Sequence, residues 1–138
     1  MAKPAKFLAA LTVTLTIIGA AASPAAWAQT AQTTPEIVNI SLSDYAFTPA
    51  ALSLKAGTAY HLHFINAGSK DHDFTAPQFF AAAEVAPADQ AKIKRGTVAI
   101  DKGQEMDVTI TPAAGDYKVT CTHFMHEMMG MHGTITVQ

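Results

Sequence analysis

The residues with the clearest chemical potential lie close together near the end of the chain. Cys121, His126 and Met131 follow one another, with four residues between one and the next. A thiolate, an imidazole and a thioether form a ligand set that suits copper better than any other common metal. This spacing also allows one tight loop between two strands to carry all three donors. The sequence therefore predicts a copper site on this loop.

A copper site of this kind needs a second imidazole from elsewhere in the chain. Trigonal copper sites take two imidazoles and one thiolate, with a weaker axial thioether. We predict that His72 completes the set, because it follows an expected strand after one turn-rich loop and can overhang the same end of the domain. A surface role for His72 stays open as the alternative, since a lone histidine carries little information.

Cys121 is the only cysteine of the chain. It cannot form an internal disulfide, so it is a ligand, a buried small hydrophobe, a free thiol or half of an intermolecular bridge. The downstream donors His126 and Met131 favour the ligand. A nucleophilic Cys–His pair is set aside, because nothing in the sequence orients the histidine or builds an oxyanion site.

Other soft or imidazole side chains surround the predicted ligands: His123, Met125, Met128, Met129 and His132. They can cover an apolar end of the domain, where methionine is an adaptable contact residue. They can also form a second copper site for transport or storage. Met129 competes with Met131 for the axial position. Met131 is preferred because residues 130–133 run directly into the last expected strand.

Short strands are the elements expected to hold these donors. Apolar and polar residues alternate with a period of two, which is typical of half-buried strands. We expect strands over residues 38–42, 52–54, 60–65, 97–100, 105–110, 116–121 and 134–137. Short strands separated by regular turns indicate an all-β fold, a Greek-key antiparallel β-sandwich. A short helical insertion is expected around residues 79–94, an Ala-rich segment interrupted by Pro87.

Two further histidines, His61 and His63, share one face of the expected strand 60–65. They can chelate a metal, or they can form part of an ordinary solvated face. Both interpretations stay open at this point.

The start of the chain is interpreted as a secretory signal peptide over residues 1–28. A basic start at Lys3 and Lys6 precedes an apolar run, and Ala-Trp-Ala at 26–28 is a typical cleavage site. A single membrane anchor is the alternative, because the run is close to spanning length. Residues 29–36 are expected to be a flexible lead-in. The expected location is the periplasm, and an anchored form would be held in the same compartment.

The mature chain is expected to be a small acidic domain. Without Lys3 and Lys6 it has seven basic and eleven acidic residues, a net charge of −4. The sequence has no basic patch interleaved with aromatic residues, so we expect no nucleic-acid partner. A mature length of about 110 residues is enough for one domain with one core.

Motifs along most of the mature chain form a specific pattern. They are Tyr45-x-Phe47-x-Pro49-x-x-Leu52-x-Leu54-x-x-Gly57, Asn66, His72-Asp73-Phe74 and Tyr117-x-Val119-x-Cys121-Thr122-x-x-x-His126-x-x-x-Gly130-Met131-x-Gly133-x-Ile135-x-Val137. This pattern resembles the cupredoxin family of blue copper proteins such as plastocyanin and azurin. The resemblance implies a cupredoxin-like copper-binding domain over residues 37–138. It also implies one copper ion, with His72, Cys121, His126 and Met131 as its ligands.

The same resemblance implies single-electron transfer by a type 1 copper protein that is not an enzyme, and the predicted signal peptide implies that it is exported. A redox partner would dock on the apolar, Met-rich end near His126, no small-molecule substrate is expected, and the protein would be a monomer. The alternative is a periplasmic copper-handling protein that stores or passes on Cu(I) through the Met- and His-rich loop. A third hypothesis is a small subunit of a larger membrane oxidase. A binuclear copper domain is excluded because it needs two cysteines in this loop.

Two departures from the family pattern bear on the site. Many members have Pro-Gly before the loop histidine, where this chain has Phe124 and Met125. Many members have an asparagine after the first histidine, and its side chain ties the two ligand loops together. Asp73 stands there in this chain and brings a negative charge. We hypothesise that this charge stabilises oxidised copper and lowers its reduction potential.

Overall fold

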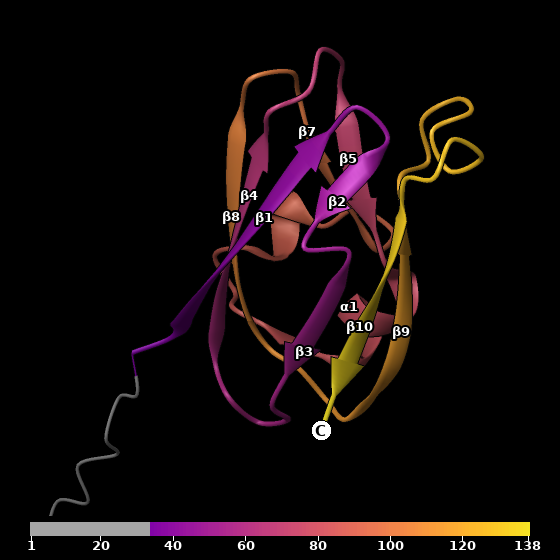
Figure 1. Cartoon of the computed structure of the whole chain (residues 1–138). Helices are drawn as coiled ribbons and strands as arrows, with labels where there is room; N and C mark the ends of the chain where they lie inside the picture. The colour runs from indigo at the N-terminus through magenta and orange to yellow at the C-terminus, as the bar shows by residue number, and fades with distance from the viewer. Residues whose placement is uncertain (1–33) are drawn as a thin grey trace, which may run out of the picture. The chain divides into compact units, whose positions relative to one another are not determined.

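Two β-sheets packed face to face form the domain (Figure 1). The computed structural model describes residues 34–138. Its strands are β1 (Glu36–Ser43), β2 (Ala46–Thr48), β3 (Ala51–Leu54), β4 (Tyr60–Asn66), β5 (His72–Thr75), β6 (Glu84–Val85), β7 (Thr97–Ile100), β8 (Glu105–Thr111), β9 (Gly115–Thr120) and β10 (His132–Val137). The predicted all-β sandwich is confirmed.

Each sheet contains five strands and mixes parallel with antiparallel pairs. The first sheet has the order β2-β1-β4-β8-β6, and the second has the order β3-β10-β9-β5-β7. β1 runs parallel to β4, and β3 runs parallel to β10. The expectation of a purely antiparallel sandwich is therefore corrected at these two pairs. Parallel neighbours need a long connection, and the intervening strands supply it, since β2 and β3 lie between β1 and β4 in the chain.

The connection between β5 and β7 carries the predicted insertion. α1 spans Pro77–Ala82, with proline in its first turn, and a short 3-10 helix, η1, spans Gln90–Lys92. The two-residue strand β6 separates them and pairs with β8. The segment around 79–94 is therefore helical only in parts. Within the described part of the chain, none of the helices combines the length and the hydrophobicity needed to cross a membrane.

Regular alternation of side chains builds the core between the two sheets. Leu62 and Phe64 of β4 point inward and are fully buried. Phe74 of β5 packs against Phe64, with 5.0 Å between the ring centroids, and against Phe47, at 5.6 Å. Because β5 begins at His72, this aromatic packing fixes the strand that carries the first predicted ligand.

Most of the predictions for the N-terminal segment concern residues that the structure does not describe. The predicted signal peptide over 1–28 and residues 29–33 of the lead-in lie outside the described residues. β1 begins at Glu36, next to the expected start of the domain at residue 37. The boundaries of these segments stay predictions from the sequence.

Asp89 ties the insertion to β8. Its carboxylate lies 2.7 Å from Lys92 Nζ and accepts a 2.8 Å hydrogen bond from the backbone N–H of Thr109. These contacts hold the pKa of Asp89 below its ordinary value of 3.8, and the contact with Lys92 has the largest effect. A lowered pKa in the folded state means that folding favours the carboxylate. The stabilising contribution is therefore present above pH 3.8 and is lost as the pH falls through the lowered pKa.

We predict that Asp89→Asn lowers the free energy of unfolding by about 1–2 kcal/mol at neutral pH, because it removes hydrogen bonds to a charged group. In acid well below pH 3.8 the variant and the natural chain should become equally stable. Urea unfolding under both conditions measures this, with the exposed Asp101→Asn as a control. Equal stability at neutral pH, or a difference that persists in acid, would show that Asp89 does not act in this way.

Candidate metal centre

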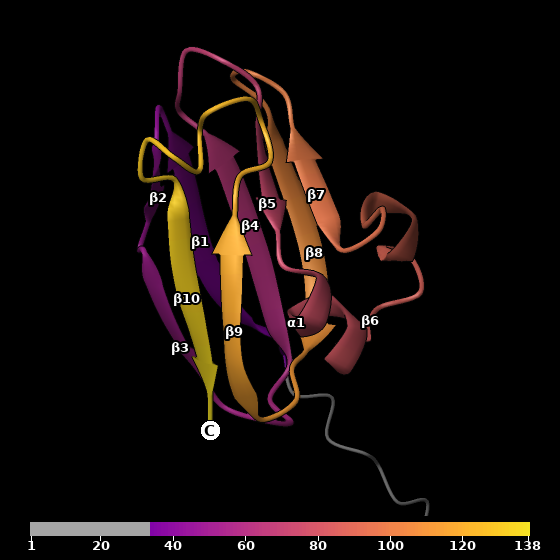
Figure 2. The same cartoon turned by 90° about the vertical axis from the view of Figure 1, so that its right-hand side faces the viewer.

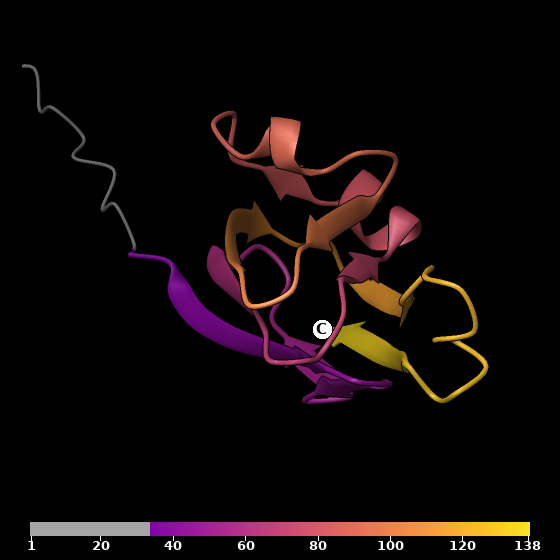
Figure 3. The ribbon, with the colours of Figure 1, turned by 90° about the horizontal axis from the view of Figure 1, so that it is seen from above.

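The predicted ligands come together at one end of the sandwich, although they are far apart in sequence. His72 is the first residue of β5, and Cys121 directly follows β9. β5 and β9 are neighbours in the second sheet. The ligand loop (residues 121–131) leads from β9 to β10 and forms the yellow lobe near the top of Figure 2. Figure 3 looks down on this end of the domain.

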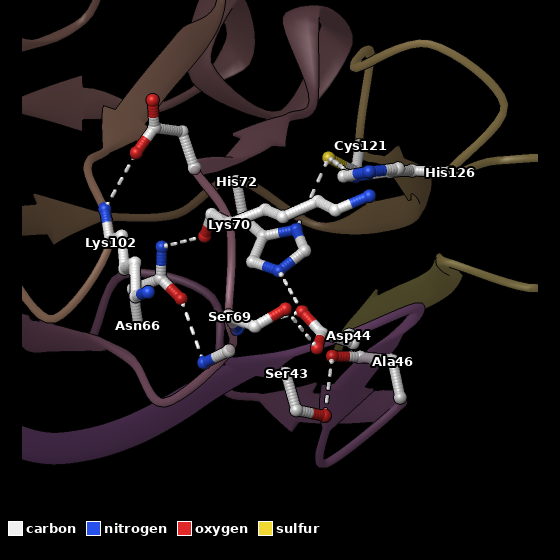
Figure 4. Close-up of polar contacts among 12 residues, drawn as sticks. Ser43, Asp44, Ala46, Asn66, Ser69, Lys70, His72, Lys102, Cys121 and His126 are labelled. Carbon is white, nitrogen blue, oxygen red and sulfur yellow. Dashed lines mark hydrogen bonds and ion pairs between the residues drawn. The ribbon is translucent and has the colours of Figure 1, made fainter.

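Donor atoms from three residues converge in a buried cluster (Figure 4). The Cys121 Sγ atom lies 3.4 Å from His126 Nδ1 and 3.9 Å from His72 Nδ1. One donor atom from each residue lies within 4.8 Å of the others, and all three residues are buried. Both rings turn Nδ1 toward the sulfur. One thiol and two imidazoles in this arrangement can hold a metal ion.

Backbone hydrogen bonds place Met131 beside this cluster. Its N–H donates to the carbonyl of His126 at 3.0 Å, and its carbonyl accepts from the N–H of Cys121 at 3.1 Å. Its side chain is fully buried, whereas Met128 is 84% exposed and Met129 is 54% exposed. The structure therefore brings Met131, and not these two methionines, to the buried side of the ligand loop.

Successive turns shape the ligand loop. The N–H groups of His126, Met129 and Gly130 donate to carbonyls three or four residues earlier. Met125 has a φ of 64°, a left-handed conformation that costs a residue other than glycine roughly 1–3 kcal/mol. Glycine, which many family members have at this position, adopts the same conformation without steric cost. The loop therefore turns into His126 without Pro-Gly, at a cost in backbone strain at Met125.

Asp73 joins β5 to the ligand loop. Its carboxylate accepts hydrogen bonds from the Thr122 N–H at 3.0 and 3.1 Å and from the Thr122 hydroxyl at 2.7 Å. It also accepts from the Thr75 hydroxyl at 2.7 Å. Its own backbone N–H donates to Cys121 Sγ at 3.5 Å. Asp73 therefore makes the tie that asparagine makes in many family members, and it leaves a buried carboxylate next to the cluster.

A second carboxylate, Asp44, holds His72 from the other side and is not marked by any motif in the sequence. Its Oδ1 atom lies 3.3 Å from His72 Nε2, as Figure 4 shows. The side chain and backbone N–H of Ser69 also bond to Asp44, and these hydrogen bonds hold the pKa of Asp44 below its ordinary value. A carboxylate on the outer nitrogen fixes the ring and leaves Nδ1 facing the metal position. Asp44 lies 28 residues before His72, in the turn after β1, so only the fold brings them together.

Burial sets the protonation of the donors. Desolvation raises the pKa of the Cys121 thiol above its ordinary value of 9.0. Desolvation also lowers the pKa of His126 below 6.5. Without a cation, the cluster therefore holds a neutral thiol and a neutral His126 ring at neutral pH. Binding of a metal ion compensates the thiolate charge and releases the thiol proton.

Comparison with known families agrees with this geometry. A model of the cupredoxin-like domain family matches residues 7–137 of the chain. The chain belongs to the cupredoxin-like domain family. The resemblance inferred from the sequence motifs is thereby confirmed. No match was found among curated proteins.

Solved structures that share the cupredoxin-like fold include two auracyanins and a multicopper oxidase. Auracyanin B is 28% identical, with a TM-score of 0.56 and a match over 77% of this chain and 91% of that chain. Auracyanin A of Chloroflexus aurantiacus, described as a "blue" copper protein, is 21% identical, with a TM-score of 0.56 and coverage of 76% and 100%. The multicopper oxidase of Campylobacter jejuni is 16% identical, with a TM-score of 0.58 over 78% of this chain and 31% of that longer chain.

Cupredoxins bind one copper ion, so the predicted cofactor is confirmed by the family. The residues of this chain fit that ion: the cluster offers a thiol and two imidazoles, and Met131 adds a buried thioether beside them. Soft sulfur and imidazole donors are those that copper prefers. Cupredoxins are typically electron carriers and not enzymes, although the fold also occurs in the multicopper oxidase.

Gly68 leaves the space in which His72 and Asp44 meet. A Cβ atom at this position would lie 2.5 Å from His72 Nε2 and 2.8 Å from Asp44 Oδ1. The Gly68 N–H is held at 2.9 Å by the side-chain oxygen of Asn66, so the backbone there cannot easily withdraw. A side chain at Gly68 must therefore push the His72 ring or its carboxylate partner out of place.

We predict that Gly68→Ala weakens copper binding about tenfold or more, as loss of a contact that orients a metal ligand does. Gly103→Ala is the control for a glycine-to-alanine change without this clash: its φ of 70° strains alanine, but a Cβ there meets nothing within 4 Å. Copper titration and thermal unfolding of both variants separate the two effects. Natural copper affinity in Gly68→Ala would show that His72 does not need this space.

Proposed function

We propose that the protein is an exported, mononuclear type 1 copper protein that carries single electrons. His72, Cys121 and His126 would form the plane of ligands, with Met131 as the axial ligand. The observation that supports this most strongly is the buried convergence of one thiol and two imidazole nitrogens. Export to the periplasm rests on the predicted signal peptide over residues 1–28.

Copper held by a thiolate and two imidazoles supplies a one-electron redox couple. The contribution of the protein is to hold the donors still. Asp44 orients His72, and Asp73 ties β5 to the residue after Cys121. Donors that are fixed from both sides move little between oxidation states, which keeps the barrier to electron transfer low. We propose no substrate turnover, and so no enzymatic activity.

A redox partner protein would dock on the exposed apolar side of the ligand loop. This surface consists of Phe124, Met125, Met128 and Met129, which are 89%, 48%, 84% and 54% exposed. Within residues 34–138, the only other large apolar side chain classed as exposed is Ile37. His126 belongs to the same loop and is 6% exposed, so the path from the cluster to the surface is short. Flexible methionines suit a transient contact, and we propose that the free protein is a monomer.

Copper handling is the second candidate, and the same exposed thioethers favour it. Methionine sulfur binds Cu(I), and His123 is a 42% exposed imidazole on the same loop. In that role the ligand loop would receive or pass on Cu(I) at its surface. The two candidates differ in the number of copper ions bound and in their oxidation state.

Copper titration of the chain from Gln29 onward, followed by visible absorption and paramagnetic resonance, tests the proposal. We expect one Cu(II) per chain, with an intense thiolate-to-copper absorption band that Cys121→Ser abolishes. His132→Gln removes an imidazole outside the ligand set and should keep the band. An unchanged spectrum in Cys121→Ser would overturn the ligand assignment. A colourless protein that binds several Cu(I) ions would favour copper handling.

We predict that Asp73→Asn raises the reduction potential, because the buried carboxylate favours the more positive oxidation state. At a separation of about 4–8 Å and an effective dielectric constant of about 20, one charge contributes roughly 2–4 kcal/mol. That corresponds to a rise of about 90–170 mV for a one-electron couple. Asp116→Asn, at the far end of β9, is the control and should leave the potential unchanged. An unchanged potential in Asp73→Asn would refute the effect of this charge.

A further inference from the structure

A second cluster of two imidazoles and a carboxylate lies on the first sheet, whereas β5 and β9 belong to the second. His61 and His63 alternate with buried residues along β4, so both rings lie on the outer face. In the neighbouring strand β8, Asp107 is opposite His63, and Thr109 is opposite His61. β4 and β8 run side by side in Figure 1.

Both rings meet at one carboxylate oxygen. Asp107 Oδ1 lies 2.6 Å from His63 Nδ1 and 3.1 Å from His61 Nε2. The side chains of His63, His61 and Asp107 are 25%, 37% and 46% exposed, so an ion can reach them from solvent. The hydrogen bond from His63 holds the pKa of Asp107 below its ordinary value, which keeps the carboxylate available as a ligand.

The other nitrogen of each ring already faces an oxygen partner. His61 Nδ1 lies 3.2 Å from Thr109 Oγ1, and His63 Nε2 lies 3.6 Å from Glu105 Oε2. A metal ion at His61 Nε2 and His63 Nδ1 requires the ring protons on these outer nitrogens. There the His61 proton can be donated to Thr109, whereas Glu105 lies 3.6 Å from His63 Nε2, beyond hydrogen-bond length. Without an ion, the hydrogen bonds to Asp107 keep the ring protons on the inner nitrogens, so metal binding must move them to the outer ones.

We propose that His61, His63 and Asp107 bind one divalent cation of the zinc class, separately from the copper centre. Two imidazoles and one carboxylate form a zinc ligand set that leaves a fourth position for water. Asp107 Oδ1 lies between the two rings where the ion would bind, and within residues 34–138 only His72, Cys121 and His126 already hold their donor atoms within 4.8 Å of one another. The carboxylate must therefore turn, and the two rings must approach each other, for an ion to take the place of the two hydrogen bonds. The positive charge of nearby Lys92 is compensated by the Asp89 carboxylate, whose Oδ1 atom lies 2.7 Å from Lys92 Nζ. The bound ion would fasten β4 to β8.

Zinc titration of the copper-loaded, reduced protein tests this site, because the copper centre is then filled and diamagnetic. Calorimetry should show one zinc ion per chain, and nuclear magnetic resonance should show shifts at the rings of His61 and His63. The unfolding temperature should rise with zinc. His63→Gln and the isosteric Asp107→Asn should each weaken zinc binding more than about tenfold, with the visible spectrum of the reoxidised copper unchanged.

His132→Gln is the matched control, because it removes an exposed imidazole outside this cluster, and it should bind zinc as the natural chain does. Thermal unfolding of each zinc-free variant checks that the sheet is intact. No zinc binding by the copper-loaded protein overturns the site. Binding that survives in both Asp107→Asn and the double variant His61→Gln/His63→Gln also overturns it, as do shifts confined to His123 and His132. None of these results bears on the copper ligands.

Discussion

The whole site depends on the burial of one thiol and two imidazoles against each other. Without a cation, burial disfavours the Cys121 thiolate and the His126 imidazolium, so the raised pKa of Cys121 and the lowered pKa of His126 share this cause. A bound metal ion reverses the balance, because a thiolate then compensates part of the metal charge. The buried donors of the folded chain are therefore better matched to a soft metal ion than to protons.

The fold approaches this cluster from two sides, and a carboxylate fastens each side. Asp44 holds the outer nitrogen of His72, while Asp73 holds Thr122, the residue after Cys121. In the proposed copper site, both contacts would position ligands and both would place negative charge near the metal. The same hydrogen bonds would then serve positioning and tuning of the potential. The exposed methionines lie on the outer side of the ligand loop, away from the buried donors.

The sequence predicts the cluster well because its donors are chemically distinctive. Cys121, His126 and Met131 are soft ligands at loop spacing, and local alternation predicts most strands close to their observed bounds. The pairing of strands is less accessible, since the parallel pair of β1 and β4 joins segments that local periodicity does not relate. Asp44 is missed for a similar reason. A carboxylate in a turn becomes a partner of His72 only when the fold brings the two segments together.

A potentiometric redox titration of the copper-loaded protein tests the central claim most directly. We predict that the single copper ion accepts and returns one electron reversibly. The thiolate-to-copper absorption band should disappear on reduction and reappear at the same potential on oxidation, with the ion retained throughout. Loss of copper on reduction, or the absence of a reversible one-electron step, would contradict the assignment of this domain as an electron carrier.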